Sequence, residues 1–184
     1  YSIMAFAAAA IGLAGCQSSR SAASGSEASE CCPSEGAAAL SEDRAMGHTA
    51  FVSMKLEAQG RVYGSMLYVP GDLDLKTPVP LVVFLHGRGE CGTDGLRPLA
   101  VGLPPAVILI PQKPGFDEAW LDHDAALLGM IEAVKKEYKV DPDRVYLTGL
   151  SQGGKGTWEF GANHAEMFAA IAPVCGFGEP AMIA

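Results

Sequence analysis

A serine enclosed by glycines has the clearest chemical potential in this sequence. The segment GLSQG, residues 149–153, has the form G-x-S-x-G and lies between an apolar run, 145–150, and a segment of helical composition, 152–164. A tight strand-to-helix turn of this kind presents the serine hydroxyl above a sheet edge and places the next N–H where an oxyanion forms. The pattern therefore predicts nucleophilic acyl transfer, with Ser151 as the nucleophile and the Gln152 N–H as an oxyanion donor.

Apolar runs that alternate with helical segments predict the framework around this serine. Four runs have the continuous apolar character of strands buried on both faces of a sheet: 79–87, 105–112, 145–150 and 168–174. Helices are predicted over 122–138, from apolar residues at three- and four-residue spacing, and over 152–164. The succession predicts an α/β fold, a mostly parallel sheet with helices on both faces.

Two turn signals add detail to this framework. Strand-like runs on either side of Gln59–Gly60 predict an antiparallel hairpin over 49–70. The sequence DPDR at 141–144 is interpreted as a turn between the first helix and the strand that follows it. The segment GTDGLRPLA at 92–100 is too rich in turn-forming residues to assign to either class of element.

Residues 49–180 resemble the α/β-hydrolase superfamily. The resemblance is carried by VVFLHGRGE at 82–90, VDPDRVYLTGLSQGGKGTW at 140–158 and HAEMFAAIAPVCG at 164–176. The sequence is most similar to the bacterial secreted esterases grouped with polyhydroxybutyrate depolymerases, feruloyl esterases and predicted peptidases. The resemblance implies the α/β-hydrolase fold, a serine esterase that cleaves carboxylic esters, and no cofactor or metal.

In this superfamily a loop of the form H-G-x-G supplies a second oxyanion donor. The matching loop is HGRG at 86–89, so the resemblance implies that the Arg88 N–H acts together with the Gln152 N–H. Aimed donors of this kind each stabilise an acyl-transfer transition state by about 2.7–4 kcal/mol. The Arg88 side chain is interpreted as solvated, since only the backbone has the implied role.

The histidine base and the acid of a catalytic triad are not identified. The superfamily places both after the serine, and the one histidine after Ser151 is His164, roughly 20 Å away along a helix that rises ~1.5 Å per residue. His86 is an alternative base on the neighbouring strand, whereas His48 and His123 have no supporting context. We therefore expect the triad partners beyond residue 184 of a longer protein, and an inactive fragment here.

The first 16 residues predict an export signal. Residues 1–15 carry no charge and are mainly apolar, but they are few for a membrane-spanning helix, which needs roughly 20 residues. LAGC at 13–16 resembles the lipobox of bacterial lipoproteins, which implies lipid attachment at Cys16; an ordinary secretory signal is the alternative. No Met or basic residue precedes the run, so we expect the true start upstream. The expected location is the bacterial cell envelope, lipid-anchored, or secretion.

A polar segment follows this signal. Residues 17–47 are dominated by Ser, Ala, Gly and Glu, and they cannot bury enough apolar surface to offset the entropy of ordering, so we predict a flexible linker. The α/β-hydrolase domain then occupies 48–184. In an oxidising compartment Cys91 and Cys175 are one candidate disulfide pair, and the adjacent Cys31 and Cys32 are interpreted as incidental.

Charge and cysteine spacing exclude several classes of partner. The formal net charge is −8 and the pI about 4.9, without a stripe of Lys and Arg, which disfavours nucleic-acid binding. The cysteine spacing does not suit zinc. The expected partners are an ester substrate, small or polymeric, and a membrane through the lipid anchor. The alternatives are a peptidase or amidase of the same fold and a non-catalytic surface lipoprotein.

Overall fold

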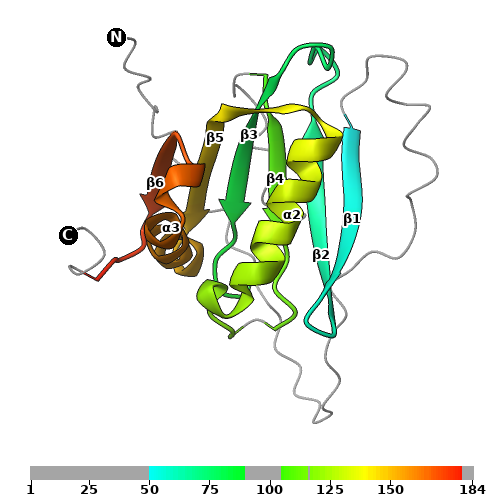
Figure 1. The fold of residues 1–184 in the computed structure, drawn as a ribbon. Helices are drawn as coiled ribbons and strands as arrows, with labels where there is room; N and C mark the ends of the chain where they lie inside the picture. Colours follow the sequence, from blue (N-terminus) through cyan, green and yellow to red (C-terminus); the bar gives the residue numbers. More distant parts are fainter. Residues whose placement is uncertain (1–49, 90–104, 116, 180–184) are drawn as a thin grey trace, which may run out of the picture. The chain divides into compact units, whose positions relative to one another are not determined.

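The structure, a computed structural model, describes residues 50–89, 105–115 and 117–179. Six strands form one sheet in the order β1-β2-β4-β3-β5-β6 (Figure 1). The strands are β1 (Ala50–Ala58), β2 (Arg61–Val69), β3 (Val79–Leu85), β4 (Val107–Pro111), β5 (Val140–Leu150) and β6 (Ala170–Val174). The helices described are η1 (Trp120–His123), α2 (Asp124–Glu137), α3 (Gln152–Asn163) and η2 (Ala165–Met167). The predicted signal peptide with Cys16, the linker, His48 and the segment 92–100 lie outside the described residues.

The hairpin and the parallel strands are present as predicted. β1 and β2 pair antiparallel, with Ala58 opposite Arg61. The two residues between them have positive φ, 53° at Gln59 and 71° at Gly60, as a tight two-residue hairpin turn requires. β3 pairs in parallel with both β4 and β5, and β5 pairs in parallel with β6. The antiparallel hairpin therefore extends a parallel sheet through the pairing of β2 with β4.

The segment 141–144 corrects one expectation, because it continues β5 where a turn was predicted. The pairing of β3 with β5 shifts register here, so the extra residues of β5 form an irregularity within the strand. The Asp141 carboxylate accepts hydrogen bonds from the Asp143 N–H, at 3.0 Å, and from Arg144 Nε, at 2.7 Å. Arg144 also donates to the Pro78 carbonyl oxygen at 2.6 Å. These hydrogen bonds keep residues 141–144 in the strand, although Asp and Pro are residue types that favour turns.

The predicted helices are present with small changes at their ends. The segment predicted as one helix over 122–138 comprises the end of the short η1, which begins at Trp120, and α2, which ends at Glu137 with Tyr138 as its C-cap. α3 starts directly after Ser151, as predicted, and ends at Asn163. Among the residues that the structure describes, no helix is both long and apolar enough to span a membrane.

Both described α-helices pack on the same face of the sheet. Alternate residues of the central strands form one buried core with the apolar stripe of α2 and with Phe160 of α3: Leu81, Val83, Leu85, Val107, Leu109, Val145, Leu147, Leu127, Ile131 and Val134. The intervening strand residues form a second cluster on the opposite face, around Ile108 and Ile110. That cluster contains strand residues only, so the described helices cover one of the two faces on which helices were expected.

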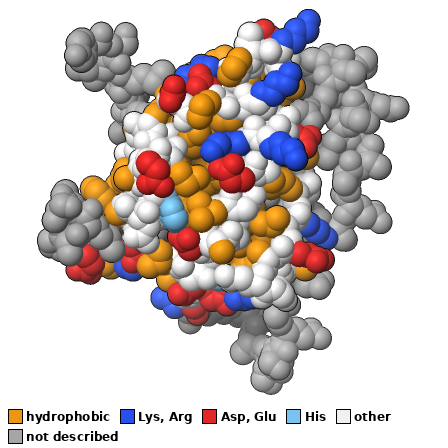
Figure 2. Space-filling view, viewed as in Figure 1, with side chains coloured by type: hydrophobic (Ala, Val, Ile, Leu, Met, Phe, Trp, Pro, Cys, Tyr) orange, Lys and Arg blue, Asp and Glu red, His pale blue; other side chains and the backbone are white. Residues whose placement is uncertain are grey.

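Charges of both signs lie on the solvent side of this helical face. Figure 2 shows Lys and Arg side chains interspersed with Asp and Glu. On α2, Lys135 contacts Glu132 at 2.7 Å, a spacing of three residues that brings side chains together on a helix surface.

Candidate active site

Ser151 occupies the turn between β5 and α3 in a backbone conformation that few L-residues adopt. Its φ is 55° and its ψ is −111°, outside the left-handed helical region, where ψ is about +30 to +60°. Conformations of this kind cost about 1–3 kcal/mol and cluster at functional sites. The Ser151 N–H donates to the Val174 carbonyl oxygen at 2.8 Å, and the residue is exposed. The strained turn is therefore present, and the assignment of Ser151 as nucleophile remains a prediction.

Two glycines permit the close approach of strand and helix at this turn. A Cβ on Gly153 would lie 1.9 Å from the Leu85 carbonyl oxygen, and a Cβ on Gly149 would lie 2.4 Å from the Gly153 carbonyl oxygen. Real Cβ atoms do not approach backbone so closely, since the overlap is strongly repulsive. Glycine at 149 and 153 therefore lets the first turn of α3 rest directly on the end of β3.

The loop 86–89 starts at the same edge of the sheet as the Ser151 turn. β3 and β5 pair in register as far as Leu85 and Gly149, so the chain leaves both strands side by side. His86 is buried, and its ring packs edge-on against Trp120 with centroids 4.9 Å apart. Its carbonyl oxygen accepts a hydrogen bond from Trp120 Nε1 at 3.1 Å. These contacts accord with a role for His86 in shaping the loop.

The Arg88 side chain points to a surface partner. Its Nε lies 2.6 Å from Asp117 Oδ1, and the two side chains are 72% and 75% exposed. An ion pair exposed to this degree contributes only about 0–1 kcal/mol. The structure thus puts Arg88 and Gln152, the two predicted oxyanion donors, on adjacent segments at one sheet edge. That their N–H groups meet at one oxyanion remains a prediction.

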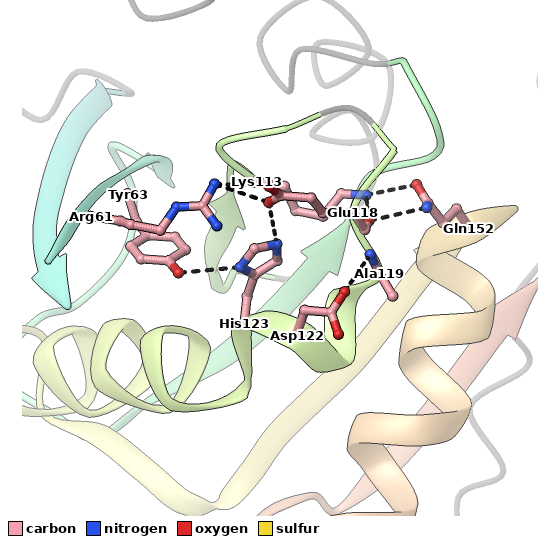
Figure 3. Close-up of polar contacts among 8 residues, drawn as sticks. All are labelled: Arg61, Tyr63, Lys113, Glu118, Ala119, Asp122, His123 and Gln152. Atoms are coloured by element: carbon pink, nitrogen blue, oxygen red, sulfur yellow. Dashed lines mark hydrogen bonds and ion pairs between the residues drawn. The ribbon is translucent and has the colours of Figure 1, made fainter. Parts of the chain in front are cut away.

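Gln152 is held by a polar arrangement that no motif in the sequence predicts (Figure 3). Lys113 Nζ donates to Gln152 Oε1 at 2.7 Å and to the Glu118 carbonyl oxygen at 2.6 Å. Gln152 Nε2 donates to the same carbonyl oxygen at 3.1 Å. We call these three contacts the Lys113 triangle. They connect the loop that follows β4 to the first residue of α3.

The Glu118 side chain extends this network to β2. Arg61 Nη2 donates to both Glu118 carboxylate oxygens, at 2.9 and 3.2 Å. His123 Nε2 lies 2.8 Å from Glu118 Oε2, and the Tyr63 hydroxyl lies 3.2 Å from His123 Nδ1. His123 had no context in the sequence, yet it is buried here. No sequence spacing signals this network, because its members come from β2, the loop after β4 and η1.

Burial and pairing shift three pKa values in this network. The hydrogen bond from Arg61 lowers the pKa of Glu118, which keeps the carboxylate ionised. Burial lowers the pKa of His123, because removal from water disfavours the charged imidazolium. Burial likewise lowers the pKa of the Lys113 ammonium. For both basic groups, the loss of hydration on burial lowers the pKa by more than the negative charge of Glu118 raises it.

His164 lies at the far end of α3 from Ser151. It caps the C-terminus of that helix, its Nε2 lies 2.8 Å from Asp124 Oδ1, and its ring packs on Phe160 with centroids 4.5 Å apart. These contacts join α3 to α2 and support the exclusion of His164 as the base. Among described residues, no hydrogen bond joins His86, His123 or His164 to the Ser151 hydroxyl.

The remaining candidate sites are few in the described ranges. Cys175 is a free, exposed thiol, and its candidate disulfide partner Cys91 lies outside the described residues, as do Cys31 and Cys32. No group of three or more His, Cys, Asp and Glu side chains in 50–89, 105–115 and 117–179 could hold a metal ion.

Comparison with known proteins identifies the architecture. A solved thermostable esterase superposes with a TM-score of 0.64 at 31% identity, over 72% of this chain and 42% of the esterase. The chain has the α/β-hydrolase fold. The predicted fold class, and the resemblance to esterases with that fold, are confirmed.

Two further proteins are similar to this chain in sequence. NocK of Nocardia uniformis subsp. tsuyamanensis, a protein assigned as an esterase, is 26% identical over 73% of this chain and 44% of its own length. Poly(3-hydroxyalkanoate) depolymerase C of Paucimonas lemoignei is 40% identical over 26% of this chain and 11% of its own length. The chain thus spans less than half the length of these relatives. No protein-family model matches it.

Replacing Gly153 with alanine tests the close approach at the turn. We expect Gly153→Ala to lower the free energy of unfolding by about 1–3 kcal/mol or more, because the added Cβ would overlap the Leu85 carbonyl oxygen. The measurement is urea denaturation. Gly129→Ala in α2 is the matched control: its Cβ would meet only a rotatable Leu56 methyl, at 3.0 Å, and a helix interior favours alanine by about 1 kcal/mol. Equal stability of the two variants would contradict the proposed packing.

The buried His123 predicts a dependence of stability on pH. Its pKa is lowered from 6.5 in the folded state, so the unfolded chain binds the proton more readily. The unfolding free energy should therefore be unaffected by this ring above pH 6.5 and should fall as the pH drops from there through the folded pKa. One group contributes a slope of at most about 1.4 kcal/mol per pH unit. Urea denaturation of wild type and His123→Gln over this range should give a shallower slope for the variant; parallel slopes would refute the assignment.

Proposed function

We propose that the protein is a serine hydrolase that cleaves carboxylic esters, with Ser151 as the nucleophile. The observation that supports this most strongly is the exposed Ser151 at a strained turn, φ 55° and ψ −111°, between a parallel strand and a helix. The similarity to esterases of the same fold supports it further. The similarity to a poly(3-hydroxyalkanoate) depolymerase adds polymeric esters to small esters as proposed substrates.

In the proposed reaction the Ser151 hydroxyl oxygen attacks the acyl carbon while a histidine base accepts its proton. The first N–H groups of α3 lack intrahelical partners and carry the positive end of the helix dipole, so the Gln152 N–H suits an oxyanion. The Arg88 N–H is the second proposed donor. The proton passes to the leaving alcohol, and water then releases the acid by the same route. We assign the base and the acid to no described residue.

We also propose that the protein is exported and carries a lipid on Cys16. The support is the sequence alone: LAGC after an uncharged apolar run. In bacteria that express the complete gene, a radiolabelled fatty acid should enter the wild-type protein and should not enter Cys16→Ser. Equal labelling of both would refute the lipid site, and an exported but unlabelled wild type would indicate an ordinary secretory signal.

Replacing Ser151 tests the proposed activity. In the product of the complete gene, Ser151→Ala should lower kcat/KM for a short-chain p-nitrophenyl ester by on the order of 10³-fold or more, because the nucleophile is lost. Ser53→Ala, at an exposed position of β1, is the matched control and should keep wild-type turnover. A fluorophosphonate probe should label wild type at Ser151 and leave the alanine variant unlabelled.

Three outcomes would contradict parts of the proposal. Full turnover by Ser151→Ala would exclude Ser151 as the nucleophile. A folded wild type that neither turns over esters nor reacts with the probe would favour a non-catalytic protein that keeps the fold. Faster cleavage of a matched p-nitroanilide than of the ester would indicate an amidase or peptidase.

A further inference from the structure

Lys113 is buried in a place where the fold itself does not require a charge. The residue is 9% exposed, and its Nζ lies 5.3 Å from the centre of the Trp120 ring. Removing an ammonium group from water is costly unless strong acceptors replace the lost hydration. Two acceptors are provided here, Gln152 Oε1 at 2.7 Å and the Glu118 carbonyl oxygen at 2.6 Å. A methionine or leucine would fill the same space without this cost, so the position favours a role beyond packing.

The Lys113 triangle fixes both ends of the Gln152 side-chain amide. Its oxygen accepts from Lys113, and its nitrogen donates to the Glu118 carbonyl oxygen. That carbonyl is held in turn, because the Glu118 carboxylate is bonded to Arg61 and lies against His123. Rotation of the first residue of α3 would break two hydrogen bonds at once. The side chain of Gln152 is therefore anchored to β2 and η1 through Glu118 (Figure 3).

This anchoring acts on the residue whose backbone has the chemical role. A hydrogen-bond donor stabilises an oxyanion effectively when its direction is fixed before the reaction, and a displacement of about 1 Å at a reacting centre can cost on the order of 10²-fold in rate. We propose that Lys113 is a positioning residue, which fixes the direction of the Gln152 N–H by holding the Gln152 side chain against the Glu118 carbonyl oxygen. The inference rests on the proposed serine-hydrolase function.

Lys113→Met tests this role in the product of the complete gene. Methionine keeps most of the volume and removes the three donors. We expect kcat for a p-nitrophenyl ester to fall by about 10- to 100-fold, with KM within about twofold of wild type, since ground-state binding does not need the oxyanion donor. Lys136→Met, the same substitution at an exposed position of α2, should leave both constants unchanged. Urea denaturation reports whether each variant is folded.

A second variant separates positioning from a general structural effect. Gln152→Met keeps the backbone N–H and breaks the triangle from the other side, so it should lower kcat by a similar factor. If Lys113 acts through Gln152, the double variant should lose no more than the more affected single variant, because both changes remove the same anchor. This comparison also covers the case in which Lys113→Met fails to fold, since Gln152→Met alone then tests the anchor.

The outcomes are distinct. Wild-type kcat in a folded Lys113→Met or Gln152→Met would overturn the inference, and so would a change confined to KM. Losses that multiply in the double variant would show that Lys113 does not act through Gln152, which also overturns it. If wild type shows no turnover that depends on Ser151, the proposed function fails first and the inference falls with it. If turnover depends on Ser151 but is unchanged when the Lys113 triangle is broken, the inference about Lys113 is overturned and the proposed function stands.

Discussion

The close approach of the first turn of α3 to the end of β3 is the constraint on which the candidate site depends. Gly153 lies so near the Leu85 carbonyl oxygen that no side chain fits between them. The chain changes direction sharply two residues earlier, at Ser151, whose φ is 55°. Such strain persists only where the surroundings over-determine it. Here the pairing of β5 with β3 on one side and β6 on the other fixes where the turn must occur. The conformation of Ser151 is therefore a consequence of sheet and helix packing.

A second layer of contacts stabilises this turn from the side of the antiparallel hairpin. The loop after β4 approaches Gln152 through Lys113, and Glu118 ties the same loop to Arg61 of β2. Buried and half-buried charges seldom increase stability over apolar residues of the same shape. The presence of these charged residues beside the Ser151 turn is therefore consistent with a role in fixing the conformation of the turn. The pairing of β2 with β4 makes these contacts possible, so the order of strands in the sheet has a direct effect on the site.

The parts of this structure that could be predicted from sequence are those with local causes. The glycines around Ser151, the Gln59–Gly60 turn and the continuous apolar strands each act within a few residues, and each was placed correctly. The turn predicted at DPDR, residues 141–144, is wrong: pairing with β3 and the Arg144 hydrogen bond to Pro78 outweigh the local turn preference of Asp and Pro. The Lys113 triangle could not be predicted, because its members meet only when β4 and β5 lie on either side of β3.

The two predicted oxyanion residues share a feature that follows from this arrangement. Each has a side chain that bonds to a residue other than Ser151: Arg88 contacts Asp117 at the surface, and Gln152 contacts Lys113 and the Glu118 carbonyl oxygen. The backbone conformation determines the direction of a backbone N–H. Side-chain contacts that fix this conformation therefore also fix the direction of the N–H. Because donors aimed in advance need no reorganisation as charge develops, residues can serve an oxyanion with their backbone while their side chains maintain its direction. If the proposed function is right, the supporting contacts determine which residues suit these two positions, and the contacts of Gln152 with Lys113 and Glu118 account for a large polar residue directly after the serine.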